Sequence, residues 1–368
     1  MTAPTSGFHS RSCARCEALP EQIQGPGRLF LWFPIGHSFG KVTAGISALL
    51  PRAEPRAESR CMVVPTDSGE LGHVLHQVAG LLTSEELRGT RVLFKEGVAE
   101  PEFADFPKVS PLDQFLFLGE AGWLVEMLAE QRLVSHFQPI VHARDTRNVF
   151  AFEALMRGVD REGKLVSPLR IMEMARKAEL LYQVDLAART TAIRESVKHG
   201  LHSPIFINFT PTAIYDPSFC LRTTVQAVRE AGLTPADVVF EVIESDQVAD
   251  VKHLLNIITY YRERGFRVAL DDLGSGYSSL NLIHQLKPDI VKLDMELIRN
   301  VHLDTYKAAI TEKLLQLAQQ IGVQTIAEGI ETVEELRWVR ERGVDFVQGY
   351  LIAKPAAPPV REPPALAA

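Results

Sequence analysis

The feature that most constrains this chain is an alternation of strand-like and helix-like segments from Val134 onward. Short apolar runs rich in β-branched and aromatic residues alternate with longer stretches of helical periodicity, several of which end on glycine, as helix C-termini prefer. In chain order the runs are SHFQPIV, VFAFEAL, PIFINFT, VVFEVIE, RVALDD, DIVKLD, TIAEG and DFVQGY. A strand followed by a helix about eight times over some 220 residues is typical of an α/β fold of the closed (β/α)8, TIM-like kind. A doubly wound open sheet is the alternative that the periodicity leaves open.

The first part of the chain lacks this rhythm. Residues 1–112 are punctuated by proline and glycine and carry a few apolar runs and one helical pattern, which predicts a smaller N-terminal α/β domain of unassigned type, with a regulatory role as a hypothesis. The periodicity of PLDQFLFLGEAGWLVEMLAEQRL predicts a connecting helix over 113–133. We expect the barrel over 134–357 and a disordered tail over 358–368.

Composition and charge exclude some classes of protein. The chain has 368 residues, 46% hydrophobic and 23% charged, so it can bury a substantial core. A net charge of −7 argues against binding polymeric nucleic acid, which needs basic surfaces. No apolar run approaches the roughly 18–20 residues of a membrane span. The N-terminus lacks the apolar segment of a secretory signal, so we expect a cytoplasmic protein without a membrane partner.

The four cysteines are too few and too scattered for a disulfide framework in a chain of this size. Cys13 and Cys16 form a Cys-x-x-Cys pair with His9 upstream, which has the spacing of half a zinc site. Cys61 or His37 could complete it. Surface thiols explain the pair at least as well, so a structural Zn²⁺ in the N-terminal region is one of two open interpretations.

Polar side chains stand where the expected strands end. Barrel enzymes collect their chemistry at the C-terminal ends of the strands. In this chain those positions hold Glu153, Asn208, Glu241 with Glu244, Asp271 with Asp272, Lys292 with Asp294, Glu328 and Gln348. One carboxylate at a strand end is usually a helix N-cap or an ion-pair partner, but seven successive ends of this kind indicate a shared site.

Carboxylates that converge on one mouth cannot all stay ionised unless cations compensate them. Oxygen ligands without histidine or cysteine suit Mg²⁺ or Mn²⁺ better than zinc. Where the strand ends, Asp271 and Asp272 can both turn toward two ions roughly 4 Å apart, a spacing that clamps a phosphoryl transition state. Gly274 and Gly276 would let the next loop fold tightly over the site. Lys292 is either a charge-balancing ion-pair partner or a group that polarises the attacking water.

These residues also carry a resemblance. FEALMR resembles the signature of the EAL-domain cyclic di-GMP phosphodiesterases, and DDLGSGYSSL, IVKLD, AEGIET and QGYLIAKP are similar to later blocks of that family in the same order. The resemblance extends from about Val134 to Pro355. It implies a barrel enzyme that uses two Mg²⁺ or Mn²⁺ ions to hydrolyse cyclic di-GMP to linear 5'-pGpG, lowering the level of this second messenger. It also implies a homodimer formed through the EAL domain.

The resemblance assigns roles position by position. It implies metal ligands at Glu153, Asn208, Glu241, Asp271, Asp272 and Glu328, and catalytic roles for Lys292, Glu328, Glu153 and Asp271. It implies substrate contacts from Arg157, Gln138, Gln348 and Leu155, the leucine that follows Ala154 in the signature. Glu244 would brace the loop that contains Gly274 and Gly276.

Departures from the family pattern are modest. Leu273 stands where phenylalanine is usual, and Gly158 stands where a large residue often follows the arginine. Neither removes a metal ligand. A non-catalytic cyclic di-GMP receptor or scaffold is the main alternative function, although such proteins typically lack one or more acidic ligands. Another metal-dependent phosphoesterase on the same fold is a third.

Overall fold

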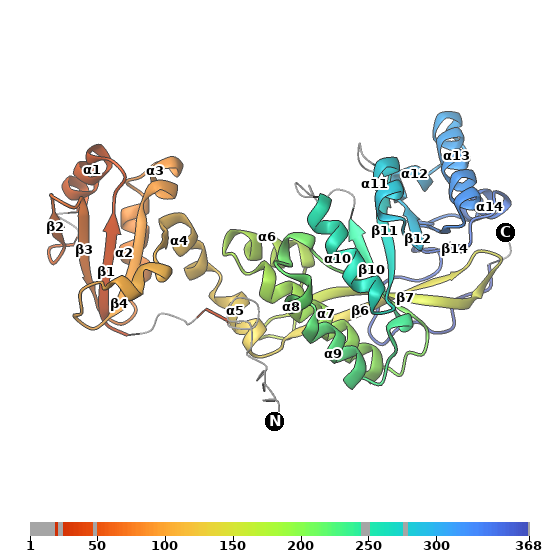
Figure 1. Cartoon of the computed structure of the whole chain (residues 1–368), viewed down its shortest axis with the longest axis horizontal. Helices are drawn as coiled ribbons and strands as arrows, with labels where there is room; N and C mark the ends of the chain where they lie inside the picture. Colours follow the sequence, from red (N-terminus) through yellow and green to blue (C-terminus); the bar gives the residue numbers. More distant parts are fainter. Residues whose placement is uncertain (1–18, 21–24, 47–49, 244–250, 275–278, 367–368) are drawn as a thin grey trace, which may run out of the picture. The chain divides into compact units, whose positions relative to one another are not determined.

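The computed structural model describes residues 19–20, 25–46, 50–243, 251–274 and 279–366. The chain divides into two compact units (Figure 1). The N-terminal unit comprises Leu19–Glu130 and Leu169–Leu180, and the C-terminal unit is built from Gln131–Pro168 and the chain from Leu181 onward. No helix in the described part of the chain is long and apolar enough to cross a membrane.

The N-terminal unit is the small α/β domain that the sequence predicts. Its five-stranded antiparallel sheet has the order β2-β3-β1-β4-β5. The strands are β1 (Gly27–Trp32), β2 (Glu54–Arg56), β3 (Cys61–Thr66), β4 (Arg91–Glu96) and β5 (Ser110–Pro111). The helices before its last strand are α1 (Gly36–Ile46), α2 (Leu71–Ala79), α3 (Ser84–Gly89) and the 3-10 helix η1 (Phe103–Lys108).

The two faces of this sheet follow from the alternation of side chains along β1. Leu29 and Leu31 form one buried cluster with residues of α1 and α2, including Val42 and Val78. Phe30, the residue between the two leucines, belongs to a second buried cluster on the other face. The period of two along a strand therefore places the two helices on one face of the sheet.

The expected connecting helix over 113–133 is wrong in one respect, because two helices stand in its place. They are α4 (Leu112–Glu120) and α5 (Gly122–Ala129), separated at Ala121. Gly119 and Gly122 flank the break, and glycine weakens a helix by its larger conformational entropy.

Helices α4 and α5 share the N-terminal unit with α6 (Pro168–Lys177) and the residues just after it. Gln114 donates a hydrogen bond to Glu179 at 2.7 Å. The guanidinium of Arg170 lies 5.0 Å from the ring centre of Trp123. A helix that the chain reaches only after the first barrel strands is therefore packed against the segment before them.

The C-terminal unit is a closed barrel. Its strands follow the order β6-β14-β13-β12-β11-β10-β9-β7, and the pairing of β7 with β6 closes the ring. The strands are β6 (Leu133–His142), β7 (Asp145–Val159), β9 (Ile205–Asn208), β10 (Val238–Ile243), β11 (Arg267–Leu273), β12 (Ile290–Leu293), β13 (Gln324–Ala327) and β14 (Phe346–Val347), with β8 (Leu165–Val166) paired to β7 outside the ring. The TIM-like barrel is confirmed, and closure excludes the doubly wound open sheet.

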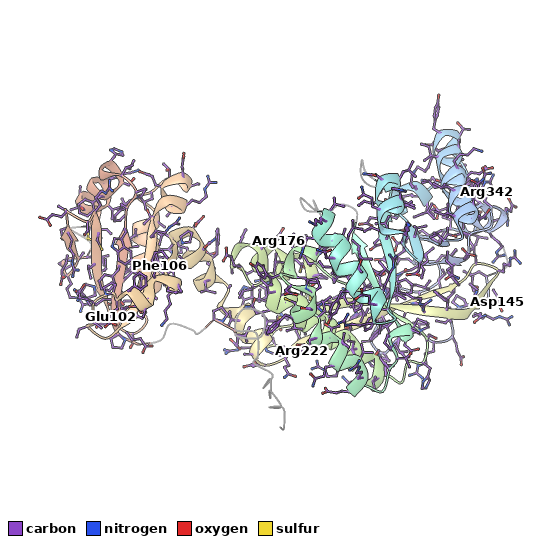
Figure 2. All side chains as sticks on the ribbon, in the orientation of Figure 1. Glu102, Phe106, Asp145, Arg176, Arg222 and Arg342 are labelled. Atoms are coloured by element: carbon purple, nitrogen blue, oxygen red, sulfur yellow. The ribbon has the colours of Figure 1, made fainter. Side chains whose placement is uncertain are left out.

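One strand departs from the strict strand-helix alternation. Strand β6 is antiparallel to both of its neighbours, β7 and β14. Only Ala143 and Arg144 join β6 to β7, and a connection this short permits a hairpin but no helical crossover. Figure 2 labels Asp145 at the far end of this long hairpin. Residues of β6 therefore approach the barrel mouth from the direction opposite to the other strands.

Helices surround the barrel (Figure 1). They are α7 (Leu181–Lys198), α8 (Pro217–Cys220), α9 (Arg222–Glu230), α10 (Val251–Glu263), α11 (Ser279–Leu286), α12 (Met295–Ile298), α13 (Thr305–Ile321) and α14 (Val333–Glu341), with the 3-10 helices η2 (Pro211–Ala213) and η3 (Pro235–Asp237). Their buried faces pack on the strands, as in α10, where Leu254, Ile257, Ile258 and Tyr261 recur at helical spacing.

The disordered tail expected over 358–368 is wrong for the described residues up to 366. The buried hydroxyl of Thr146 donates to the carbonyl of Pro364 at 2.8 Å and accepts from the amide of Leu366 at 3.0 Å. Arg361 donates to the carbonyl of His199. The tail is ordered because these polar groups find partners on the barrel, and because its prolines lose little conformational freedom on folding.

Candidate active site

The candidate site lies one layer above a buried plug inside the barrel. One apolar residue from each of the eight strands forms this plug: Ile140, Ala151, Phe206, Val239, Ala269, Ile290, Ile326 and Phe346. Alternate residues of a strand face the same side, so the residue two positions nearer the mouth also points into the barrel. This residue follows the plug residue in every strand except β6, which runs the other way. Those residues are Gln138, Glu153, Asn208, Glu241, Asp271, Lys292, Glu328 and Gln348. A period of two thus assembles eight polar side chains from separate segments into one ring.

Lys292 lies at the centre of this ring. Its ammonium Nζ is 2.6 Å from Glu241 Oε1, 2.7 Å from Glu328 Oε1 and 3.0 Å from Asp271 Oδ1. Glu153 Oε2 follows at 3.7 Å. The lysine side chain is 1% exposed, so these contacts exclude water. One buried ammonium therefore faces four carboxylates.

Three amides complete the ring. Asn208 Nδ2 donates to Glu153 Oε1 at 3.2 Å and to Glu241 Oε2 at 2.9 Å. Gln348 Nε2 donates to Glu153 Oε2 at 2.7 Å and to Gln138 Oε1 at 3.1 Å. Gln138 in turn donates to the carbonyl of Ala353 at 3.0 Å. Asn208 and Gln348 thus help to fix the carboxylates and the Gln138 side chain, and Gln138 is itself held by a backbone carbonyl.

The electrostatics of the ring favour an added positive charge. Burial raises the pKa of Glu241 well above its ordinary value and also raises that of Asp271. Burial raises the pKa of Glu328 to about 8, and burial with the neighbouring aspartates raises the pKa of Asp272 to about 6. Burial alone would lower the pKa of Lys292, but the carboxylates outweigh it and hold that pKa well above its ordinary value. The carboxylates therefore carry more negative potential than one ammonium neutralises.

The donor set fits a hard divalent cation. One oxygen from each of Asp271, Asp272 and Glu328 lies within 4.8 Å of the others. Asp272 has a φ of 56°, in the left-handed region that aspartate adopts more readily than most residues, and the register of β11 against β12 shifts at this point. This turn brings both aspartates to the mouth. Among the residues that the structure describes, no second group of three acidic, histidine or cysteine ligands lies as close together.

A cavity of about 370 Å³ opens beside these carboxylates. Its lining residues are Gln138, Glu153, Leu155, Asp272, Asp294, Met295, Arg299, Glu328, Gly329, Glu331, Gln348, Gly349 and Tyr350. A volume of this size is typical of small-molecule sites. The cavity combines an acidic floor with apolar and aromatic walls.

Two of the expected substrate residues occupy different places. Leu155 lines the cavity, two residues beyond Glu153 on the same face of β7. Arg157 follows on that face but is not among the lining residues, and its guanidinium donates to the carbonyl of Met156 at 2.8 Å. Burial lowers the pKa of Arg157, while Tyr350 and Glu153 oppose this shift.

The loop-bracing residues are only partly described. Gly274 has a φ of 104°, and a Cβ there would lie 2.3 Å from Leu297 Cδ1, so the position requires glycine. Gly276 and Glu244 lie outside the described residues.

The zinc hypothesis gains no support from the described residues. His9, Cys13 and Cys16 lie outside them. Cys61 is buried in the N-terminal sheet, and burial raises the pKa of its thiol to about 11, which favours the protonated form.

The sequence places Asp294 among the strand-end polar residues without indicating a specific role for it. It does not single out six other cavity residues: Met295, Arg299, Gly329, Glu331, Gly349 and Tyr350. Glu331 and Tyr350 lie within the AEGIE and QGY runs, three and two residues after Glu328 and Gln348. Including the two or three residues that follow each strand-end residue would have identified both. Arg299 pairs with Glu331 at 2.6 Å, and nothing in its local sequence marks that contact.

Fold and site together define a TIM-like barrel whose mouth holds a lysine-centred acidic ring. The family model of the EAL domain matches residues 121–355, more than half of the chain. The chain belongs to the EAL domain family.

Known proteins of this family are similar to the chain. It is 30% identical over 232 residues to the probable cyclic di-GMP phosphodiesterase PdeG of Escherichia coli K12, covering 61% of this chain and 44% of that protein. The chain thus spans less than half the length of this relative. A standalone versatile EAL protein from Vibrio cholerae O395, solved in its c-di-GMP-bound form, is 39% identical with a TM-score of 0.55, covering 61% of this chain and 92% of that one.

A third comparison concerns the fold alone. BlrP1 of Klebsiella pneumoniae is 20% identical with a TM-score of 0.57, covering 90% of this chain and 96% of that one. The similarity in fold therefore extends beyond the barrel.

Proposed function

We propose that the protein is a divalent-metal-dependent phosphodiesterase that hydrolyses cyclic di-GMP to linear 5'-pGpG. The observation that carries this proposal is the complete acidic ring. Lys292 Nζ lies within 3.0 Å of three carboxylates, and Asp271, Asp272 and Glu328 group their oxygens beside an open cavity. The names of similar EAL proteins support the choice of substrate.

Two Mg²⁺ or Mn²⁺ ions would be held by oxygens of Glu153, Asn208, Glu241, Asp271, Asp272 and Glu328. When bound, such ions supply Lewis acidity toward phosphoryl oxygens and lower the pKa of water. The amide donors of Asn208 and Gln348 turn the Glu153 carboxylate toward the centre of the ring. The protein thus supplies a preorganised set of ligands.

Lys292 has a second task in this proposal. The carboxylates keep it charged and fixed, and the three that lie within 3.0 Å occupy its three N–H groups in this structure. In this proposal one carboxylate would release Nζ, which would then donate a hydrogen bond to the attacking water or to the charge that develops on the phosphoryl group. Gln348 Oε1 is buried and accepts no hydrogen bond from the described part of the chain. This oxygen is therefore available to water or substrate.

Substrate placement follows from the shape of the cavity. Leu155 offers an apolar wall, and Gln138 and Gln348 offer amides at the inner end. Arg157, just beyond Leu155 on the same face of β7, would reach a substrate phosphate with its guanidinium fork.

The non-catalytic receptor is the second candidate. What favours hydrolysis is that every expected ligand position holds an oxygen-bearing side chain and that those described are brought into one ring. Another metal-dependent phosphoesterase activity on this fold would show a different choice of substrate.

The deciding experiment is turnover by the purified full chain with Mg²⁺ or Mn²⁺, with the product identified by chromatography. We expect linear 5'-pGpG from cyclic di-GMP and little product from cyclic di-AMP. Glu153→Ala and Asp271→Ala should each lower turnover more than about 100-fold while binding persists. Glu263→Ala, at a side chain that is 68% exposed, is the control and should leave turnover unchanged. Binding without product at saturating metal would favour the receptor instead.

We also propose a homodimer formed through the EAL domain, on the family resemblance. Light scattering after size exclusion should give twice the chain mass of 40.9 kDa. A single-chain mass at micromolar concentration would contradict it.

A further inference from the structure

Helices α7 and α9 carry a buried network of polar side chains that does not belong to the ring at the barrel mouth. Asp185 and Arg189 of α7 form an ion pair at 2.8 Å, with side chains 3% and 2% exposed. Arg189 also donates to the hydroxyl of Thr224 on α9, which is fully buried. None of the three belongs to the described residues that line the cavity, so the mechanism above gives them no task.

The second carboxylate oxygen of Asp185 has its hydrogen-bond partner outside these two helices. Asp185 Oδ1 accepts a hydrogen bond from the backbone amide of Thr210 at 2.7 Å, while Oδ2 accepts from Arg189. Thr210 is two residues beyond Asn208, where β9 ends. A carboxylate that accepts a backbone N–H makes a stronger bond than a neutral acceptor does. The carboxylate is held on one side by Arg189 and itself holds the strand-end segment on the other.

Just after Asn208 the hydrogen bonds between β9 and β10 come to an end. The last ladder partner of β9 is Glu241, opposite Asn208, and the amide of Phe209 reaches the carbonyl of Glu241 only at 3.4 Å. The ring of Phe209 is buried against Tyr261, 5.5 Å away. Buried apolar residues, among them Phe209 and Ile214, anchor this turn by packing, and Asp185 adds a side-chain acceptor for the Thr210 amide.

The position of the turn matters to the site because Asn208 bridges two carboxylates. Its single Nδ2 must lie within hydrogen-bond reach of both Glu153 and Glu241. A shift of about 1 Å at the end of β9 would break at least one of these bonds. It would also move the amide oxygen that is expected to bind metal.

We propose that Asp185 is a positioning residue for the metal site, acting through the Thr210 amide to hold Asn208 between Glu153 and Glu241. This inference rests on the proposed function and names a residue that touches neither metal nor substrate. Replacing a buried ion pair by apolar residues of similar volume is often neutral or stabilising, so the stability of the fold does not by itself require this pair. Arg189 and Thr224 fix the carboxylate so that one oxygen always faces Thr210.

Two double variants separate positioning from simple stability. Asp185→Asn with Arg189→Met keeps an amide oxygen for the Thr210 N–H and removes both charges. Asp185→Leu with Arg189→Met removes the charges and the acceptor together. Because neither leaves an unpaired buried charge, both should fold, with melting temperatures within about 5 °C of each other.

Mn²⁺ binding to the nucleotide-free full chain, measured by calorimetry, is the readout. We expect the leucine variant to bind Mn²⁺ at least about 10-fold more weakly than wild type, as loss of an outer hydrogen-bond partner of a metal ligand usually does. The asparagine variant should stay within about threefold of wild type. Glu195→Gln is the matched control, because it removes another buried carboxylate of α7, one that pairs with Lys198 at 3.0 Å. It should leave Mn²⁺ affinity unchanged.

Equal Mn²⁺ affinity in the two double variants would overturn the proposal. If the leucine variant does not fold, the asparagine variant decides alone: retained affinity supports the proposal, and a tenfold loss refutes it. The proposed function fails separately, if wild type binds Mn²⁺ but leaves cyclic di-GMP intact.

Discussion

At the scale of single residues, burial gives Lys292 a defined set of contacts that its sequence position leaves open. Its place in IVKLD predicts a side chain at the barrel mouth but not its partners. The structure places three carboxylates within 3.0 Å of its Nζ. The two interpretations left open by the sequence, ion pair and catalytic donor, are therefore compatible, because the ion pairs are what orient the donor.

Lys292→Met should destabilise the metal-free protein by about 3–5 kcal/mol, because it leaves several buried carboxylates without their counter-charge. Denaturant unfolding with a chelator present measures this. Added Mn²⁺ should recover part of the loss, since it restores positive charge to the ring. Lys313→Met, at an exposed lysine of α13, is the control and should change stability by less than about 0.5 kcal/mol. A metal-free Lys292→Met protein as stable as wild type would refute this account of the ring.

At the scale of elements, the segments that follow strands β13 and β14 hold the site together by close backbone contact. The amide of Ile330 donates to the carbonyl of Gln348 at 3.0 Å, and the amide of Leu351 donates to the carbonyl of Ile330 at 3.0 Å. Gly349 lies between these bonds. Glu328 and Gln348 are neighbours at the mouth because these two segments touch.

Gly349→Ala tests this contact. A Cβ at this position would lie 2.1 Å from the carbonyl oxygen of Ile330, so the two segments must separate. We expect a stability loss of at least about 1–3 kcal/mol together with reduced turnover. Gly119→Ala, in α4 with no atom near the added carbon, should instead be neutral or stabilising by up to about 1 kcal/mol. Wild-type turnover by Gly349→Ala would show that the contact is dispensable.

A second element-level prediction concerns pH and the start of α3. Hydrogen bonds from Lys41, from the backbone of Thr83 and from Ser38 lower the pKa of Glu86 from 4.5 to about 2. A carboxylate whose pKa is lower in the folded state stabilises the fold above its unfolded pKa, and this contribution is lost as the pH falls toward the folded value. Glu86→Gln should therefore lower stability at pH 7, with a difference from wild type that shrinks between pH 4.5 and pH 2. Unfolding curves across that range measure it, and a pH-independent difference would count against the ion pair.

At the scale of the whole molecule, the two units do not divide at a single point in the chain. Helix α6 follows the first barrel strands in sequence yet groups with α4 and α5. Its Ile171 is fully buried, and Lys177 lies 5.7 Å from the ring centre of Phe117. The sequence predicts a connecting helix over 113–133 between the two domains, whereas the two helices found there pack against α6 and the residues just after it.

Two shortened chains test this organisation. A chain that begins at Pro111 keeps α4 and α5 and should retain turnover within about threefold of the full chain. A chain that begins at Gln131 uncovers α6 and should lose at least about 1.5–3 kcal/mol of stability, the value of one fully buried isoleucine. Thermal melts and turnover of both are the measurements. Equal stability of the two would mean that α6 does not depend on the preceding helices.

The sequence by itself determined the barrel, its family and the ring of strand-end residues. It could do so because strand periodicity and ordered motifs are local signals, and a closed barrel brings all strand ends of one kind to one mouth. Only the tertiary structure decided the reversed direction of β6, the partners of Lys292, the bond from Asp185 to Thr210, the ordered tail and the Arg299–Glu331 pair. All of these except the direction of β6, which follows from its two-residue link to β7, depend on contacts between residues distant in the chain. No local pattern encodes which distant groups will satisfy a buried charge or backbone amide.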